Sequence, residues 1–252
     1  MTRILLLGGT TEASRLAIAL AARGDDAVFS YAGRTHALAD QPLPMRVGGF
    51  GGIDGLRQYL RTEAITHVID ATHPFAAQMS AHAVAACKAE GVALCAFERP
   101  AWTPAPEDHW TRVADIAAAV AALPKAPTRV FLAIGRQNLQ AFATRPEHFY
   151  LLRLVDAPPD PLPFPQAEAE IARGPFTEAG DRALFETHRI ELIVAKNSGG
   201  EGARAKLDAA RALGVPVILI DRPAIPPRPI AGSVDAVLDW LDHAAPRVER
   251  GV

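Results

Sequence analysis

Short apolar runs alternate with longer amphipathic stretches along most of the chain. In the first half, five runs have the length and hydrophobicity of buried strands: Arg3–Leu7, Ala27–Tyr31, Met45–Val47, His67–Ala71 and Ala93–Phe97. Helical stretches follow the first, third and fourth of these runs: Thr11–Ala22, Ile53–Glu63 and Ala76–Glu90. Because strands that alternate with helices form βαβ units, the pattern predicts a parallel sheet.

The second half repeats this plan. Its predicted strands are Val130–Ile134, Tyr150–Val155, Ala169–Ala172, Leu192–Ala195 and Val217–Ile220. Two further helices are predicted at Asp115–Leu123 and Val234–His243. Pro100–Trp110 is rich in proline, which indicates a linker or crossing segment between the halves.

Four pairs of segments resemble each other in the same order, at offsets of about 120–126 residues: Arg3–Ala13 with Arg129–Leu139, Val47–Phe50 with Arg173–Phe176, Gly91–Ala101 with Gly214–Ala224, and Val113–Asp115 with Ser233–Asp235. This self-similarity predicts an internal duplication. The expected fold is α/β, with two Rossmann-like parallel-sheet domains and a cleft between them.

The predicted boundaries follow from this duplication. Residues 1–100 form the first domain, 101–127 a linker with a helix, and 128–252 the second domain, with packing of the last helix on the first domain left open. The precision of such boundaries is a few residues.

Composition narrows the function classes. The net charge of −2 gives no general attraction to nucleic acid or to an anionic membrane. Two cysteines, Cys87 and Cys95, lie in apolar surroundings and fit core positions in a reducing compartment. The apolar run at Ile4–Leu7 is too short for a signal peptide or a membrane span, so a cytoplasmic location is expected.

The turn after the first strand has the form of a dinucleotide-binding motif. Gly8, Thr10 and Ala13 occupy the positions of G-x-G-x-x-G, with threonine replacing the second glycine. Backbone N–H groups at the helix start would face a phosphate, and threonine hydroxyls would add donors. The predicted cofactor-binding residues of this turn are Gly8, Gly9, Thr10, Thr11 and Glu12.

The second strand favours NADPH over NADH. It is followed by Arg34, where an NAD-binding unit usually has an acidic residue for the ribose hydroxyls. A guanidinium group can bind a 2′-phosphate with two hydrogen bonds, whereas an acid would repel it. Gly48 and Gly49 follow the third strand, and their lack of side chains permits a close approach to the same ligand.

Polar residues also end the other central strands. Asp70, Thr72 and His73 close the fourth strand, where ligands bind in doubly wound folds; Asp70 and Thr72 are predicted cofactor contacts and His73 a substrate contact. Lys196, Asn197 and Ser198 close the corresponding strand of the second half, and Lys196 is the predicted proton donor or substrate clamp. Further cations are predicted near the cleft, with Arg136 placed as an anion contact at a helix start: Arg99, Arg136, Arg153, Arg173 and Arg222.

The sequence lacks the motifs of several enzyme classes. None of the three tyrosines, Tyr31, Tyr59 and Tyr150, has a lysine four residues later, as short-chain reductases require. The eight histidines show no metal-ligand spacing, so no metal site is predicted. There is no G-x-S-x-G nucleophile motif.

Together these motifs resemble the precorrin-6A reductase family of corrin biosynthesis. The resemblance lies in eight segments that span the chain in order to about Pro223: Leu5–Ala13, Ala32–Arg34, Val47–Gly52, Asp70–Ala76, Glu98–Trp102, Ala133–Leu139, Arg173–Phe176 and Lys196–Gly200. It implies a two-domain enzyme that uses NADPH to reduce one double bond of precorrin-6A, giving precorrin-6B. The protein would position the two reactants while the cofactor supplies the hydride.

The resemblance also implies the substrate contacts. A tetrapyrrole with many carboxylates fits the predicted substrate-binding residues, which are the five arginines together with His73, Asn197 and Ser198. Transient contact with neighbouring pathway enzymes stays open. The cobalt-containing substrate also stays open, and only prior frequency and the lack of a metal cluster favour the metal-free form. A two-domain glycosyltransferase and a non-catalytic NADPH sensor stay open as rival functions.

Overall fold

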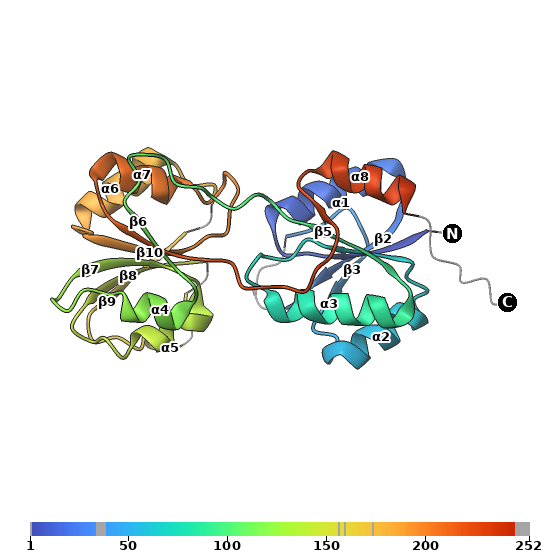
Figure 1. The fold of residues 1–252 in the computed structure, drawn as a ribbon, viewed down its shortest axis with the longest axis horizontal. Helices are drawn as coiled ribbons and strands as arrows, with labels where there is room; N and C mark the ends of the chain where they lie inside the picture. Colours follow the sequence, from blue (N-terminus) through green and yellow to red (C-terminus); the bar gives the residue numbers. More distant parts are fainter. Residues whose placement is uncertain (1, 34–38, 156, 159, 173, 245–252) are drawn as a thin grey trace. The chain divides into compact units, whose positions relative to one another are not determined.

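The computed structural model describes residues 2–33, 39–155, 157–158, 160–172 and 174–244. The chain forms two compact units (Figure 1). The first unit comprises Met1–Pro100 together with Ala224–Val252, and the second comprises Ala101–Pro223. Each unit is a parallel sheet with helices on both faces, so the predicted α/β class is confirmed.

The first unit contains six parallel strands in the order β12-β5-β4-β1-β2-β3. In chain order these are β1 (Arg3–Leu7), β2 (Asp26–Tyr31), β3 (Met45–Val47), β4 (His67–Asp70), β5 (Ala93–Phe97) and β12 (Ile230–Ala231). The central strand β1 pairs with β2 on one side and β4 on the other, at Leu6↔Phe29 and Leu6↔Ile69. The strand order therefore reverses beside β1, which is where doubly wound sheets bind ligands.

Four helices cover the first sheet: α1 (Thr11–Arg23), α2 (Gly52–Thr62), α3 (Ala77–Glu90) and α8 (Val234–His243). Helices α1 and α8 lie on one face, and α2 and α3 lie on the other (Figure 1). Leu16 and Leu20 of α1 are fully buried against the sheet in one cluster with Val237 of α8. An ion pair of 2.7 Å between Arg23 and Asp242 also joins the two helices.

The second unit has the same strand order around its centre, β6-β11-β10-β7-β8-β9. Its strands are β6 (Trp110–Val113), β7 (Arg129–Ala133), β8 (Phe149–Leu154), β9 (Ala167–Ile171), β10 (Leu192–Lys196) and β11 (Val217–Ile220). Short helices α4 (Ile116–Ala121) and α5 (Leu139–Phe142) lie on one face (Figure 1). Helices α6 (Glu178–Thr187) and α7 (Ala205–Leu213) lie on the other.

The outermost strand of each sheet comes from an unexpected part of the chain. Strand β6 follows β5 in sequence but pairs with β11 of the second unit. Strand β12 follows β11 but pairs with β5 of the first unit, at Ile230↔Ala96. The observed division thus differs from the predicted one: residues 101–127 contribute β6 and α4 to the second unit, and residues from 224 onward belong to the first. Backbone hydrogen bonds of two short strands decide these boundaries, and the partners of these strands are distant in the sequence.

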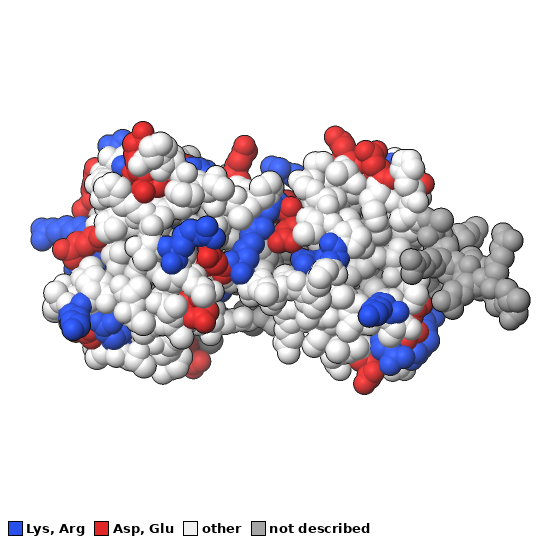
Figure 2. Space-filling view, in the orientation of Figure 1, with Lys and Arg blue, Asp and Glu red and all other residues white. Residues whose placement is uncertain are grey.

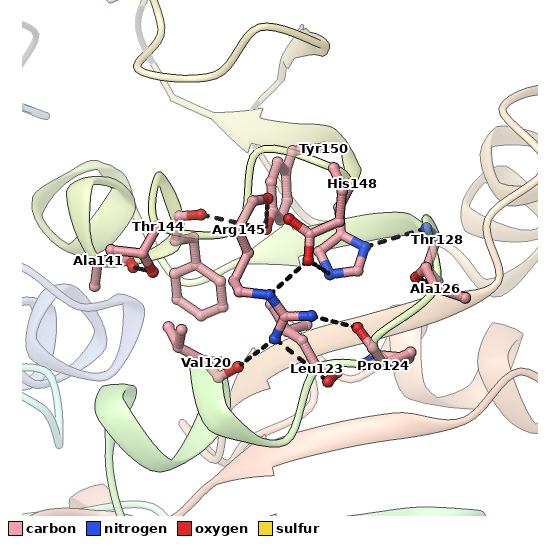
Figure 3. Close-up of polar contacts among 12 residues, drawn as sticks. Val120, Leu123, Pro124, Ala126, Thr128, Ala141, Thr144, Arg145, His148 and Tyr150 are labelled. Carbon is pink, nitrogen blue, oxygen red and sulfur yellow. Dashed lines mark hydrogen bonds and ion pairs between the residues drawn. The ribbon is translucent and has the colours of Figure 1, made fainter.

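A polar cluster closes the amino-terminal edge of the second sheet (Figure 3). The guanidinium group of Arg145 donates to the carbonyls of Val120, Leu123 and Pro124, which fixes the end of α4. His148 is fully buried, and its Nδ1 accepts a hydrogen bond of 3.1 Å from Thr128 N–H. Burial lowers the pKa of His148. This cluster lies away from the carboxyl ends of the strands, so its role is in the fold.

Candidate functional site

The β1–α1 turn has the backbone that the motif predicts. A Cβ atom on Gly8 would lie 2.1 Å from Cζ of Phe29, so only glycine fits over this ring. Gly9 has φ of +114°, which disfavours residues with a side chain. Ala13, at the third motif position, is fully buried between α1 and the sheet. The turn therefore brings backbone N–H groups to the surface at the start of a 13-residue helix.

Thr10 serves the turn itself. Its hydroxyl accepts a hydrogen bond from Ala13 N–H at 3.1 Å and caps α1. The same hydroxyl donates to the carbonyl of Ala71 at 2.8 Å. Its one proton is thus used within the protein, and the structure does not support the predicted extra phosphate donor at this hydroxyl. Thr10 joins the ends of β1 and β4 instead.

Glu12 and Arg99 form an ion pair beside this turn. Arg99 Nη1 lies 2.6 Å from Glu12 Oε2, and both side chains are 18% exposed. Burial acts to raise the pKa of Glu12, but the hydrogen bond and charge of Arg99 outweigh it and the pKa is lowered. A small pocket here is lined by Thr10, Glu12, Thr72, Pro74, Phe97, Glu98 and Arg99. Arg99, predicted as a substrate contact, therefore lies beside the predicted nucleotide turn.

The end of β4 presents a second set of predicted residues. Asp70 is 3% exposed, and its Oδ1 accepts hydrogen bonds from the hydroxyl and the backbone N–H of Thr72, at 2.7 and 3.2 Å. Oδ2 of Asp70 is buried without a hydrogen-bond partner among the described residues. His73 is exposed, and its Nδ1 accepts from Phe75 N–H. Thr72 reaches the pocket beside Glu12, whereas Asp70 holds the turn in place.

The glycine turn after β3 is held by an arginine that the sequence analysis did not select. Arg46 donates to the hydroxyl of Ser30 and to the carbonyls of Gly48 and Gly49, at 2.8, 2.9 and 3.3 Å. Its guanidinium carbon lies 3.9 Å from the centre of the Phe50 ring. Arg46 therefore fixes the two predicted glycines. Arg34, the predicted 2′-phosphate contact, lies outside the described residues.

The corresponding turn of the second unit differs. Gly135 keeps a positive φ of +76°, but only a three-residue 3-10 helix, η1 (Arg136–Asn138), and the four-residue α5 follow it. Arg136 is exposed at the start of η1. The prediction of an anion site at a helix start is not supported here, because so short a helix has little dipole.

The end of β10 is organised by hydrogen bonds to the backbone. Asn197 is 3% exposed, and its amide both accepts from Trp102 N–H and donates to Trp102 O, at 2.8 and 3.0 Å. Arg222 donates to the carbonyls of Asn197 and Ser198, at 3.0 and 3.1 Å. These contacts give Asn197 and Arg222 a clear structural role. They also fix the backbone that follows Lys196.

Lys196 is half-buried at this strand end, and burial lowers the pKa of its ammonium group. A lysine with a lowered pKa at the carboxyl edge of a sheet is suited to give up a proton or to hold an anion. Ser198 is buried two residues further on. This geometry is compatible with both predicted roles of Lys196.

Arg153 lies inside the second unit. It forms an ion pair of 2.5 Å with Asp181, a residue that the sequence analysis missed, and it stacks on Phe176 at 4.1 Å. Both residues of the pair line a pocket at the ends of β7 and β8. Arg173, the other predicted cation of this region, lies outside the described residues.

The described residues give little support for thiol or metal chemistry. Both cysteines are buried, and burial raises the pKa of Cys87 to about 12 and that of Cys95 to about 11, so neither is an activated thiol. No group of three or more potential metal ligands was found among these residues. Nor is any helix in them long and apolar enough to cross a membrane. On the face shown in Figure 2, basic and acidic side chains occur in small mixed groups.

Comparison with known proteins identifies the family. The precorrin-6x reductase CbiJ/CobK family matches residues 3–242. This chain belongs to that family. A precorrin-6A reductase of Rhodobacter capsulatus is 64% identical over 253 residues, which cover 100% of each chain. One from Mycobacterium tuberculosis is 44% identical, over 90% of this chain and 91% of its own.

The structural comparison agrees. The solved structure of CobK precorrin-6A reductase has 65% sequence identity to this chain and a TM-score of 0.94, covering 98% of this chain and 99% of its own. A more distant relative, the cobalt-precorrin-6A reductase of Priestia megaterium, is 30% identical over 96% of this chain and 97% of its own. As a member of the precorrin-6x reductase family, the chain is an oxidoreductase, and the resemblance drawn from its motifs is confirmed.

Proposed function

We propose that the chain reduces precorrin-6A in cobalamin biosynthesis, with NADPH bound by the first unit and the macrocycle bound by the second. The observation that carries this proposal is the 64% identity, over the whole chain, to a precorrin-6A reductase. The relatives named precorrin-6A reductase are 44% identical or more, whereas those named cobalt-precorrin-6A reductase are 30% identical or less. This contrast favours the metal-free substrate.

The first turn fits a dinucleotide. Gly9 has a positive φ, and a Cβ placed on it would have no atom within 4 Å, so the backbone of the turn is open to a close ligand at this residue. The N–H of Ala13 is already bonded to Thr10. The pyrophosphate would therefore contact the N–H groups of Gly9, Thr10 and Thr11. When bound, NADPH supplies the hydride for the reduction.

The other nucleotide contacts follow from the same edge of the sheet. Gly48 and Gly49, fixed by Arg46, would lie along the adenosine half. Arg34 would bind the 2′-phosphate, as its place after β2 suggests. Thr72 and Glu12 line the pocket at the ends of β1, β4 and β5, where the nicotinamide half lies in doubly wound folds. Asp70 acts on this half by holding Thr72.

The second unit would hold the polycarboxylate substrate. Lys196 stands at its central strand end, with a pKa lowered by burial, and would either donate a proton to the reduced macrocycle or hold one of its carboxylates. Arg222 and Asn197 fix the backbone beside it. Family membership sets aside a glycosyltransferase, and turnover would set aside the non-catalytic sensor.

The direct test is turnover. Purified protein is mixed with precorrin-6A and NADPH, and NADPH oxidation is followed together with the visible spectrum and the product mass. We expect NADPH consumption and a product heavier by two hydrogens, with NADH much less effective. Tight NADPH binding without turnover of precorrin-6A or of its cobalt form would instead support a sensor.

A further inference from the structure

A second pocket lies wholly within the second unit, at the carboxyl ends of β7 and β8. It encloses about 600 Å³, including its open mouth. Among the described residues, its ionisable lining residues are Arg153 of β8, Asp181 of α6 and Lys206 of α7, and Phe131 and Phe176 line it as well. In α/β units of this topology, ligands bind beyond the carboxyl ends of the strands. The location alone makes this pocket a candidate binding site.

The guanidinium group of Arg153 is held by an ion pair and by two aromatic rings. Its Nη2 contacts Asp181 Oδ1 at 2.5 Å, and its guanidinium carbon lies 4.1 Å from the Phe176 ring centre and 5.1 Å from that of Phe131. The side chain is 12% exposed. Its Nε is buried and, within the described part of the chain, has no hydrogen-bond partner. A buried N–H that lacks an acceptor costs free energy unless a ligand or a water supplies one.

Lys206 adds a second cation. It is 8% exposed, its Nζ donates to the carbonyl of Ala203, and it lies 4.9 Å from the ring centre of Trp102. Lysine is almost never so deeply buried without a functional or structural reason. Sequence analysis gave no sign of it, because its helix position resembles that of any surface lysine.

The charges of the pocket favour an anion. Among the described lining residues, Arg153 and Lys206 are cations and Asp181 is an anion. An adjoining hollow shares Arg153, Phe176 and Asp181 and adds Glu170, but Glu170 is exposed on β9, where water screens its charge. A carboxylate accepts charge-assisted hydrogen bonds from guanidinium and ammonium groups, so these two cations suit a carboxylate ligand.

We propose that this pocket binds a carboxylate arm of the substrate. The guanidinium group of Arg153 and Lys206 Nζ donate to the carboxylate, while the rings of Phe131 and Phe176 contact the aliphatic part of the arm. Asp181 fixes the guanidinium group in place. The identity of the substrate rests on the proposed function, but the affinity of the pocket for a short aliphatic carboxylate does not.

The kinetic test removes the charge of Lys206. Lys206→Met keeps a similar length, and Arg182→Met removes an exposed cation from α6 as the matched control. We expect Lys206→Met to raise the KM for precorrin-6A about tenfold or more, with kcat and the Kd for NADPH unchanged, because a charge-assisted contact held throughout the reaction affects binding alone. An increase no larger than that of Arg182→Met would overturn the proposal.

A binding test separates the pocket from the proposed function. Sodium propionate is titrated into ¹⁵N-arginine-labelled protein, with sodium chloride at equal ionic strength as the reference. The Arg153 Nε–H signal is assigned by its loss in Arg153→Lys, a variant that keeps the positive charge beside Asp181. We expect a saturable shift with propionate only, weakened in Lys206→Met. A saturable shift without turnover of precorrin-6A would contradict the proposed function but support the carboxylate pocket. Absence of a saturable shift would contradict the pocket proposal.

Discussion

The first βα turns of the two units begin alike and then diverge. Gly9 and Gly135 occupy equivalent positions, and both have a positive φ, +114° and +76°. In the first unit the preceding residue is Gly8 and the helix that follows has 13 residues. In the second unit the preceding residue is the buried Ile134, and η1 and α5 replace the long helix.

This comparison separates folding from binding. The positive-φ glycine is needed to turn from a central strand into a helix, so both units keep it. The turn itself needs neither Gly8 nor a long helix, since the second unit turns without them. The start of the long capped helix in the first unit is what a pyrophosphate requires. The second unit instead buries cations beside α6 and α7. The two proposed anion sites thus differ in kind although they lie on the same scaffold.

The largest expected effect comes from adding a side chain at Gly8 in the β1–α1 turn. Gly8→Ala would place a Cβ against Phe29 and displace the backbone by a distance of ångström order. We expect the Kd for NADPH to rise about 100-fold, since the loss of one or two charge-assisted hydrogen bonds, about 1.5–3 kcal/mol each, has an effect of this order. Gly202→Ala, where a Cβ has no atom within 4 Å, is the control. Fluorescence titration of NADPH measures both, and an unchanged Kd in Gly8→Ala would break the comparison.

Lys196 should have the next largest effect. Lys196→Met is expected to lower kcat/KM about tenfold or more, because either proposed role needs the ammonium group. Lys196→Arg sharpens the result: a clamp survives this change, whereas a proton donor does not. If Lys196 is the donor, activity falls as pH rises through its lowered pKa, and so below the ordinary lysine range. Wild-type rates in Lys196→Met would remove both roles.

Variants of the Glu12–Arg99 pair should affect the affinity for NADPH differently, which tests the role of each residue. Arg99→Met leaves the Glu12 carboxylate facing an anionic cofactor, so we expect about tenfold weaker NADPH binding. Glu12→Gln should not weaken it, and the double variant should return most of the lost affinity. A calorimetric double-mutant cycle measures this coupling. Equal weakening in Arg99→Met and in the double variant would show that repulsion by Glu12 is not the cause.

The smallest effect concerns stability, away from both sites. The pKa of His148 is lowered by burial, so the unfolded chain binds this proton more readily than the folded one. Its contribution to stability is complete above the unfolded pKa, about 6.5, and is lost as pH falls below it. We expect a Tm a few degrees lower at pH 5.5 than at pH 7.5. His148→Asn, which keeps an acceptor for Thr128, should reduce that difference, and an unchanged difference would assign it to other groups.

Much of the fold can be predicted from hydrophobic pattern. The first predicted strand, Arg3–Leu7, matches β1, and His67–Ala71 overlaps β4. The pattern misses strands β6 and β12 because they lack a run of buried residues and flank proline-rich segments. Their exchange between the units depends on long-range pairing, which local pattern does not encode.

The candidate site is predictable where a motif imposes backbone geometry. Gly8 and Gly9 are such positions, since no other residue suits the turn. Sequence reasoning misses Arg46, Asp181 and Lys206, because their significance arises from burial and from partners distant in sequence. Asn197 is selected for its place at a strand end, but its amide bonds to Trp102 show a structural role that the sequence does not reveal.

The most direct test of the central claim is the stoichiometry of NADPH binding by isothermal titration calorimetry. Because the first unit alone combines the Gly8-Gly9 turn with a long capped helix, we predict one NADPH per chain. Binding should be lost or greatly weakened in Gly8→Ala and unchanged in Arg136→Ala at the equivalent turn. Two NADPH molecules per chain, or loss of binding in Arg136→Ala, would contradict the account.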